Sequence, residues 1–383
     1  MKKAKILTIT GGIFIVAGVG CAVAGFLIPE KVLPDFEFPK IPSAEAKDTV
    51  YSDLTGLPIA ADDKTAPTYC IQTPNGTDGA RPQAGLNEAG VIFEAIAEAG
   101  ITRFAAIYQK PTAAVIGPIR SLRLYYLQWD TPFDCTIVHA GGADDALAAV
   151  RSGGYKDLTE NYTYMYRSSV GGRRWNNLFT NATLLARMNA DRGYGNSTVK
   201  GFTRMTPAES LKDLVDNGMN GGLVITEKAT SDTSVVTAKV SDISVRFGYS
   251  PTFNVGYKYD AATNSYLRSY DNGYTYDIYA CPSDYLGEVS PENACELKQM
   301  SPAVVVAMIV SEKKSWDNYH EDITTLGSGE AYVFQNGYAI KGTWIKNSVA
   351  DQIQFFNSEG KEIALAPGQT FVEAVPNYGS VDY

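Results

Sequence analysis

An uninterrupted apolar run near the start of the chain is its first clear pattern. Residues 6–28 contain no charged side chain, and a run of this length can span a bilayer as a helix. Three of the first five residues are lysines, and basic residues favour the cytoplasmic side. We therefore predict a single N-terminal transmembrane helix within 1–28, with the rest of the chain on the extracytoplasmic side. Cleavage as a signal peptide and lipid attachment at Cys21 are the alternatives.

Beyond this run, a proline-rich segment gives way to alternating apolar runs. Residues 29–50 hold prolines at 29, 34, 39 and 42, which favour an extended stalk. From 51 to 218, strand-like runs such as TYCIQ and CTIVHA are mixed with helix-like runs such as DDALAAVRSG. This mixture predicts an α/β (α+β) N-terminal domain with a mixed sheet. Its last helix is expected to start at Thr206, which forms a capping-box pattern with Glu209, and to close at Gly218.

Short strand-like runs dominate the remainder of the chain, residues 219–383. Examples are PAVVVAMIV and EAYVFQNGYAIKGTWIK, and turn residues occur at Asn336-Gly337 and at 358–360. This pattern predicts a β-rich C-terminal domain.

Residues 90–109 carry an alternating pattern that we interpret as a β-hairpin rather than a helix. The run is rich in Ile, Val, Phe and Tyr near its ends, and Ala99-Gly100 suits the turn. A two-residue turn there sets Ile96 opposite Arg103. Three charged side chains then share one face of the sheet: Glu94, Glu98 and Arg103. They form either a functional carboxylate–arginine cluster or a structural ion pair.

Two arginines follow in a segment that the pattern assigns to the start of a helix. Gly117-Pro118 suits a helix opening, because proline at the first helical position loses no hydrogen bond. Arg120 and Arg123 would then lie one turn apart beside the uncompensated N-terminal amides. Cations at this helix end are unfavourable unless an anion lies nearby. That anion is either a ligand's phosphate or carboxylate, or one of the two hairpin glutamates.

Composition limits the range of partners. The chain has 42 Asp and Glu against 33 Lys and Arg, a formal net charge of -9 and a pI near 4.9. Nonspecific nucleic-acid binding needs broad basic surface, so this class of partner is excluded. The hydrophobic share of 45% is that of a globular protein with a sizeable core. Any anion site on such an acidic protein must be local.

Cysteine and histidine usage bears on disulfides and metals. Four cysteines lie outside the apolar run and permit two disulfides in an oxidising compartment. Cys281 and Cys295 flank one loop and are the preferred pair, which leaves Cys70 and Cys135. With only two histidines and no zinc spacing, we expect no His/Cys metal centre and no cofactor.

Further candidate residues lie in two loops. His139 ends a predicted strand ahead of a helix, where it serves as a general base, a hydrogen-bond donor or a satisfied structural residue. Residues 166–181 suit a sugar or phosphorylated glycan if they are not simply a solvated loop. Their candidate ligand-binding side chains are Arg174, Asn176 and Asn177, beside Trp175. His320 has acidic neighbours suited to a catalytic pair, but we give it little weight because it lies in the second domain.

Several sequence blocks resemble the DUF3048, or YerB-like, family. They are ARPQAGLNEAGVIFEAIAEAGITRFAAIYQ, IGPIRSLRLYY and VHAGG in the first domain, and YLRSYDNG, GSGEAYVFQNGYAIKGTWIK and GKEIALAPGQTFVEAVP in the second. The resemblance implies a two-part, lipoprotein-like extracytoplasmic protein of the bacterial membrane with no known function. Its motif blocks contain Arg81, Glu94, Glu98, Arg103, Arg120, Arg123 and His139. Family members tend to have Pro-His-Asn-Leu-Tyr where this chain has residues 175–179, so Asn176 replaces a histidine. This departure favours binding over catalysis.

Together these patterns predict a membrane-anchored envelope protein. Its first domain is expected to bind an anionic envelope ligand or a cell-wall partner in an Arg/Glu/His cleft. Peptidoglycan, another wall polymer or an envelope protein are the expected partners. The main alternative is a hydrolase or transferase acting on a glycan or phosphodiester, with Glu94 or Glu98 as acid/base. A structural scaffold is the third possibility.

Overall fold

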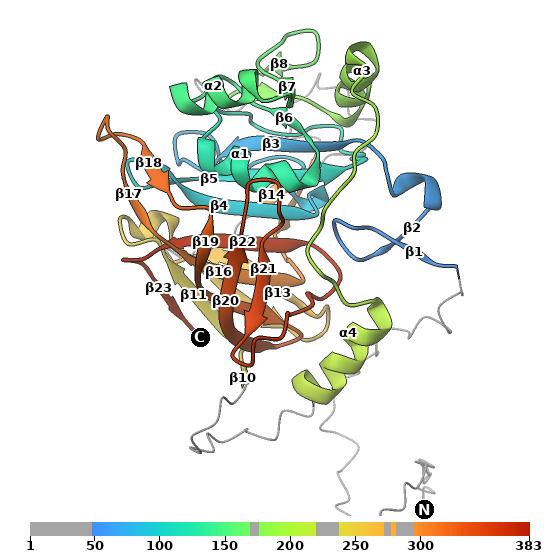
Figure 1. Cartoon of the computed structure of the whole chain (residues 1–383), viewed down its shortest axis with the longest axis vertical. Coiled ribbons are helices and arrows are strands. Elements are labelled where there is room, and N and C mark those ends of the chain that lie inside the picture. Colours follow the sequence, from blue (N-terminus) through green and yellow to red (C-terminus); the bar gives the residue numbers. More distant parts are fainter. Residues whose placement is uncertain (1–47, 169–175, 220–236, 272–276, 281–294) are drawn as a thin grey trace, which may run out of the picture. The chain divides into compact units, whose positions relative to one another are not determined.

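The computed structural model describes residues 48–168, 176–219, 237–271, 277–280 and 295–383. All of them belong to one compact unit, residues 41–383, in which a single mixed sheet joins the two predicted halves (Figure 1). The eleven strands of this sheet are, in spatial order, β10 (Thr237–Lys239), β20 (Tyr338–Lys346), β19 (Gly327–Gln335), β16 (Val304–Val310), β22 (Thr370–Pro376), β4 (Val91–Glu98), β5 (Ile101–Gln109), β3 (Thr68–Pro74), β6 (Thr136–Val138) and β7 (Lys156–Leu158), with β21 (Gln354–Asn357) on β20.

The sheet is parallel where the two halves meet. Strand β22 lies between β16 and β4 and pairs in parallel with both. Their sequences, VVVAMIV, TFVEAVP and VIFEAIAE, are nearly fully buried, as expected for strands covered on both faces. This central position explains why apolar residues occur on both faces of these strands.

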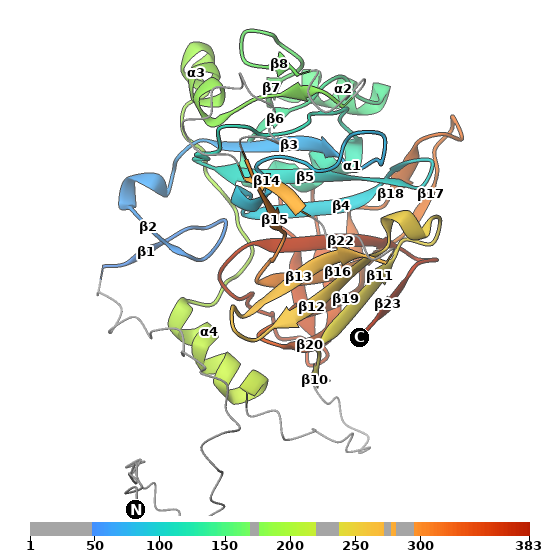
Figure 2. The same cartoon turned by 180° about the vertical axis from the view of Figure 1, so that it is seen from behind.

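A second, antiparallel sheet packs on one face of the first. Its strands are β13 (Ser265–Tyr270), β12 (Val255–Asp260), β11 (Asp242–Arg246) and β23 (Ser380–Asp382), seen beside β16 and β22 in Figure 2. Aromatic side chains fill the space between the sheets: the ring of Tyr257 on β12 packs against that of Phe371 on β22, with centroids 6.2 Å apart. The opposite face of the large sheet has its own core around Phe93 and Trp129.

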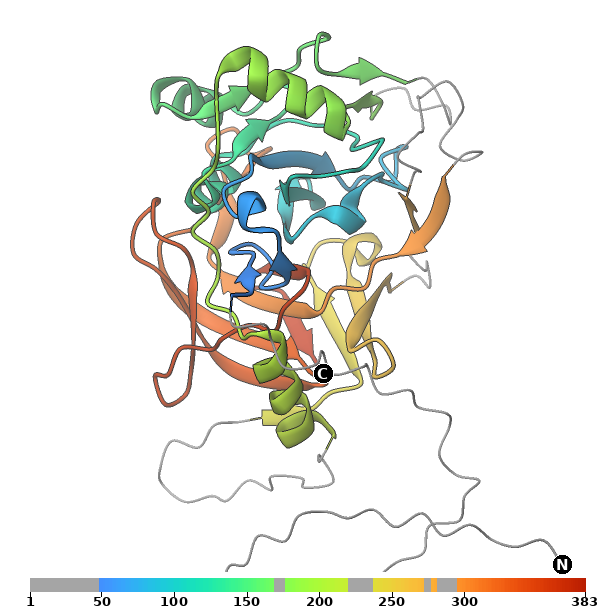
Figure 3. The same cartoon turned by 90° about the vertical axis from the view of Figure 1, so that its right-hand side faces the viewer.

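Helices are few and lie mainly on the first half. They are α1 (Leu124–Asp130), α2 (Asp144–Ser152), α3 (Ala182–Arg192), α4 (Pro207–Asp213) and the π-helical turn Leu214–Met219, with 3-10 turns at Ala61–Asp63, Leu86–Glu88, Thr131–Phe133 and Pro251–Phe253. Figure 3 shows α2 and α3, drawn in green at the top, at the β6–β7 end of the sheet. The capping box of Thr206 and Glu209 opens α4 as predicted.

Four two-stranded sheets complete the described unit. They are β1 (Val50–Tyr51) with β2 (Pro58–Ile59), β8 (Tyr166–Arg167) with β9 (Leu178–Phe179), β14 (Asp277–Ala280) with β15 (Glu296–Gln299), and β17 (Glu312–Lys314) with β18 (Glu321–Ile323). The mixed sheet and the β-rich character predicted from the pattern are confirmed. The domain boundary at 218/219 stays a prediction.

Two predictions concern the chain ends and the cysteines. No helix within the described ranges is long and apolar enough to cross a membrane, and the predicted anchor at 6–28 and most of the stalk lie outside those ranges. Cys70 and Cys135 form a disulfide between β3 and the start of β6, with Cα atoms 5.7 Å apart. Cys281 lies outside the described residues, so its pairing with Cys295 stays a prediction.

Candidate functional site

The predicted hairpin exists, but a bulge divides its charged side chains between two faces. Strands β4 and β5 turn at Ala99-Gly100, and Glu98 pairs with Ile101 as predicted. The register then shifts between Ile96 and Glu98, so Arg103 pairs with Ala95 rather than with Ile96. One extra residue in a strand reverses the side that every later side chain faces. The prediction that Glu94 shares a face with Glu98 and Arg103 is therefore wrong.

Glu98 lies between two arginines. Its Oε1 accepts from Arg103 Nη2 at 2.7 Å and its Oε2 accepts from Arg123 Nη2 at 2.5 Å. Although burial favours the neutral acid, attraction by both arginines and the hydrogen bond from Arg123 outweigh it and hold the pKa of Glu98 below its usual range. We call these three residues the Arg–Glu–Arg cluster. One carboxylate against two guanidinium groups leaves the cluster with one uncompensated positive charge.

Both arginines are buried. Arg103 is 4% exposed and Arg123 is 5% exposed. Their Nη1 atoms donate to backbone carbonyls, of Ser121 at 2.6 Å and of Leu122 at 3.0 Å. The Nε atom of each is buried without a hydrogen-bond partner among the described residues. A buried guanidinium with an unused donor is costly unless a ligand or solvent meets it.

The helix predicted to open at Gly117-Pro118 does not form there. Residues 117–122 contain no helical turn, and α1 begins only at Leu124, with Arg123 as the flanking residue. The backbone N–H groups of Ile119, Arg120 and Leu122 bond to carbonyls of other segments: Leu178, Gln72 and Gly141. These long-range partners replace the intrahelical bonds that the prediction assumed.

The two arginines of this segment consequently separate. Arg123 enters the Arg–Glu–Arg cluster, whereas Arg120 is half-buried and forms no ion pair within the described part of the chain.

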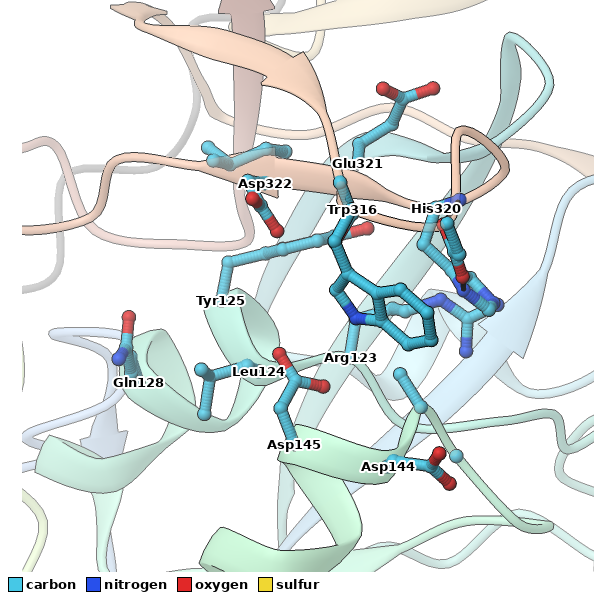
Figure 4. Close-up of a pocket in the computed structure, with 15 residues that line it drawn as sticks. Arg123, Leu124, Tyr125, Gln128, Asp144, Asp145, Trp316, His320, Glu321 and Asp322 are labelled. Carbon is cyan, nitrogen blue, oxygen red and sulfur yellow. Dashed lines mark hydrogen bonds and ion pairs between the residues drawn. The ribbon is translucent and has the colours of Figure 1, made fainter.

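A pocket of about 310 Å³ opens beside Arg123 (Figure 4). It is lined by residues 123–125 and 128 at α1, 142–145 at the start of α2, and 315–317 and 320–323 of the β17–β18 hairpin. Trp316 lies at the centre of these side chains and is 88% exposed. The pocket therefore combines elements of both halves, whereas the sequence placed the candidate cleft in the first domain alone.

His320 and Asp317 form a fixed pair at this pocket. Asp317 Oδ2 lies 2.6 Å from His320 Nδ1, while its Oδ1 accepts from the backbone N–H groups of His320 and Tyr319, both at 2.9 Å. These backbone bonds, with those to the His320 ring, lower the pKa of Asp317 to about 2. A β-bridge between Glu98 and His320 holds the hairpin beside the Arg–Glu–Arg cluster. His320 thus belongs to the pocket, despite the little weight that its position in the sequence suggested.

Glu94 belongs to a buried network on the other face of the sheet. It is fully buried, pairs with Arg268 of β13, and accepts from Asn75 Nδ2 at 3.0 Å. Arg81 lies on this face too: its Nε donates to Asn75 Oδ1 at 3.0 Å, and its guanidinium lies 3.9 Å from the centroid of the Tyr270 ring. Neither Glu94 nor Arg81 lines the pocket.

The remaining candidates that the structure describes do not line the pocket. His139 is fully buried, with Nδ1 2.6 Å from the Gly141 carbonyl and Nε2 2.9 Å from Asp157 Oδ1, so both ring nitrogens are occupied structurally. Asn176 is buried and donates to Asp78 at 2.8 Å, and Asn177 accepts from Arg167 at 2.6 Å. Arg174 lies outside the described residues, as does Trp175.

Metal ligands do not gather in the described part of the chain. No group of three or more His, Cys, Asp or Glu side chains there is arranged to hold a metal ion. The pocket offers charged and aromatic side chains instead, which suit direct contacts with an organic ligand.

Fold and site together define a two-part, β-rich protein with a charged pocket between two helices and a β-hairpin. Residues 54–195 match the family described as "Protein of unknown function (DUF3048) N-terminal domain", and residues 243–372 match "Protein of unknown function (DUF3048) C-terminal domain". The chain belongs to the DUF3048 family, as its sequence blocks indicated.

A protein and a crystal structure from Bacillus subtilis are similar to most of the chain. The protein named "Putative lipoprotein YerB" is 27% identical over 304 residues, which cover 79% of this chain and 80% of that protein. The crystal structure of the YerB protein matches with a TM-score of 0.67 at 22% identity, covering 87% of this chain and 100% of that chain. At this identity the structural likeness shows a shared fold.

Proposed function

We propose that this chain is an extracytoplasmic binding protein held at the bacterial membrane. The apolar run at 6–28, the lysines before it and the name of the YerB relative support this location. Anchoring is through a transmembrane helix at 6–28 or through a lipid at Cys21. Peptidoglycan, another wall polymer or an envelope protein supplies the ligand, a choice that rests on the location.

The proposed ligand site is the pocket beside Arg123, and the bound group is anionic. The observation that carries this proposal is the Arg–Glu–Arg cluster, in which two buried arginines share one carboxylate. Its uncompensated charge lies at a pocket wall, since Arg123 lines the pocket. A carboxylate or phosphate would neutralise that charge with a charge-assisted hydrogen bond. Trp316 offers a flat apolar surface for the rest of the ligand.

Binding is better supported than catalysis by the predicted acid/base residues. Both oxygens of Glu98 are held by arginines, which favours the ionised form and leaves neither oxygen free for proton transfer. Glu94 is fully buried on the opposite face of the sheet, away from the pocket. A hydrolase or transferase using either glutamate therefore lacks geometric support.

Binding can be tested with the purified extracytoplasmic part and soluble fragments of cell-wall polymers. In calorimetric titrations we expect saturable binding that Arg123→Gln weakens about tenfold or more, because a charge-assisted hydrogen bond contributes about 1.5–3 kcal/mol. Glu98 keeps Arg103 as a partner in this variant, so folding should survive, which a thermal melt checks. Arg151→Gln, on an exposed residue of α2, is the matched control and should bind like wild type.

The enzyme alternative has its own readout in the same samples. Incubation of the fragments with wild type and with Glu98→Gln should give no product from either protein. Product formed by wild type and lost in Glu98→Gln would favour the enzyme, and equal binding by Arg123→Gln and wild type would exclude the proposed site.

A further inference from the structure

The pocket beside Arg123 carries opposite charges at two of its borders. Arg123 provides the buried cation, with its Nε unpartnered among the described residues. Three exposed carboxylates line the same pocket: Asp144, Asp145 and Asp322. None of these aspartates forms an ion pair within the described ranges, although the cationic cluster lies at the same pocket. A ligand in the pocket therefore meets the positive charge of Arg123 and the negative charges of the three aspartates as separate groups.

The unpaired aspartates constrain the chemistry of the ligand. A ligand with only anionic groups would meet Arg123 but would be repelled by three carboxylates. A ligand with only cationic groups would meet the carboxylates but would face the uncompensated charge of the Arg–Glu–Arg cluster. A molecule that carries one anionic and one cationic group can pair with Arg123 through the first and with the aspartates through the second. Its charges are then complementary to those of the pocket.

The apolar lining and the size of the space point to a small zwitterion. Leu124, Tyr125 and Ile323 line the same pocket, together with the exposed ring of Trp316. An indole face stabilises a nearby ammonium group as well as an apolar side chain. A volume of about 310 Å³ lies at the lower end of the range for small-molecule sites.

We propose that the ligand is a free amino acid or a short free peptide, which carries both a free ammonium and a free carboxylate. The carboxylate bonds to Arg123, the ammonium lies among Asp144, Asp145 and Asp322, and Trp316 covers the intervening atoms. This proposal rests on the binding function proposed above and specifies its ligand class.

The test uses four forms of one dipeptide, alanyl-alanine, in both the L,L and D,D configurations. The forms are the free zwitterion, the N-acetylated anion, the C-amidated cation and the doubly blocked neutral molecule. Calorimetry on the intact extracytoplasmic part should show the tightest binding for the zwitterion. Each blocked end should weaken binding about tenfold or more, since each removes one charge-assisted contact.

Variants assign each charge of the dipeptide to one border. Asp322→Asn should weaken binding of the zwitterion about tenfold but should not weaken binding of the N-acetylated form, because it removes a carboxylate that repels this anion. Arg123→Gln should weaken both, and Trp316→Ala should weaken every form. Asp62→Asn, on an exposed aspartate outside the pocket, is the control for overall charge and should match wild type.

The outcomes separate the two proposals. Equal affinity for the zwitterion and the N-acetylated form would overturn the zwitterion assignment while leaving an anion site intact. Arg123-dependent binding of wall fragments without binding of any dipeptide form would do the same. Absence of binding by every dipeptide form and every wall fragment would overturn both proposals.

Discussion

Glu312 is a buried carboxyl group whose protonation should make folding stability depend on pH. It is 7% exposed, and its Oε1 accepts from the Tyr378 hydroxyl at 2.6 Å. Burial, reinforced by the nearby Glu321 carboxylate, raises the pKa of Glu312 to about 7 against the attraction of Lys314 and the bond from Tyr378. The folded state therefore binds this proton more tightly than the unfolded state does. Its contribution to stability is complete below pH of about 4.5 and is lost as pH rises to about 7.

This loss of stability with rising pH should differ measurably between wild type and Glu312→Gln. Raising the pKa of Glu312 from 4.5 to about 7 corresponds to roughly 3 kcal/mol of unfolding free energy, which is lost across that pH window. The amide cannot ionise but can still accept from Tyr378, so the variant should lose less stability between pH 4.5 and 7.5. Urea denaturation at several pH values measures the difference. Glu359→Gln, at an exposed turn, is the control; parallel curves for wild type and Glu312→Gln would contradict the prediction.

Among the elements, the β4–β5 hairpin positions the Arg–Glu–Arg cluster. A substitution in its turn should raise the folding stability. Ala99 and Gly100 have φ angles of 50° and 76°, the left-handed pair typical of a two-residue hairpin turn. Alanine is strained in that region, whereas asparagine tolerates it. Ala99 is exposed, so Ala99→Asn should raise the unfolding free energy by about 0.5–1 kcal/mol in urea denaturation. Ala99→Val should lower it; the reverse order of these variants would contradict the assigned turn.

The same hairpin shows how far the sequence alone predicts the site. Alternation and the Ala99-Gly100 dipeptide predict both strands and their turn, because these signals are local. The bulge before Glu98 leaves no such signal, yet it alone decides that Glu94 faces Arg268 and Glu98 faces Arg123. One irregular residue therefore separates side chains that simple alternation places together.

Long-range contacts explain the other differences from the predicted elements and site. The segment at 117–122 is not helical because three of its N–H groups bond to strands and loops elsewhere in the chain, which a helix-start motif cannot reveal. Likewise, Trp316 and His320 reach Arg123 only through the packing of the β17–β18 hairpin against the first half. A tryptophan four residues before a histidine, with acidic neighbours, is a signal that the sequence contains, but no pattern links it to Arg123.

At the scale of the whole molecule, a buried charge network ties the two halves together. Arg268 of β13 donates to Glu94 of β4, while Tyr257 of β12 donates to Glu373 of β22. Burial and repulsion by Glu94 raise the pKa of Glu373 well above its usual range, and the attraction of Arg268 does not offset them. Arg268 therefore pairs with Glu94, while Glu373 beside them stays neutral. Both glutamates belong to the large sheet and Arg268 to the smaller one, so the network joins both sheets and both halves of the sequence.

The neutral state of Glu373 predicts different effects on stability for substitutions of Arg268 and of Glu373. Arg268→Met removes the ion-pair partner of the buried Glu94 and should cost about 3–5 kcal/mol of unfolding free energy. Glu373→Gln replaces a neutral acid by a neutral amide of the same shape and should change stability by less than about 1 kcal/mol at neutral pH. Because β4 and β22 are paired in the sheet that joins the halves, calorimetry should show one cooperative transition for wild type, displaced as a whole in Arg268→Met. Two separate transitions would contradict the coupling of the halves. A loss of unfolding free energy in Glu373→Gln equal to that in Arg268→Met would contradict the neutral state of Glu373.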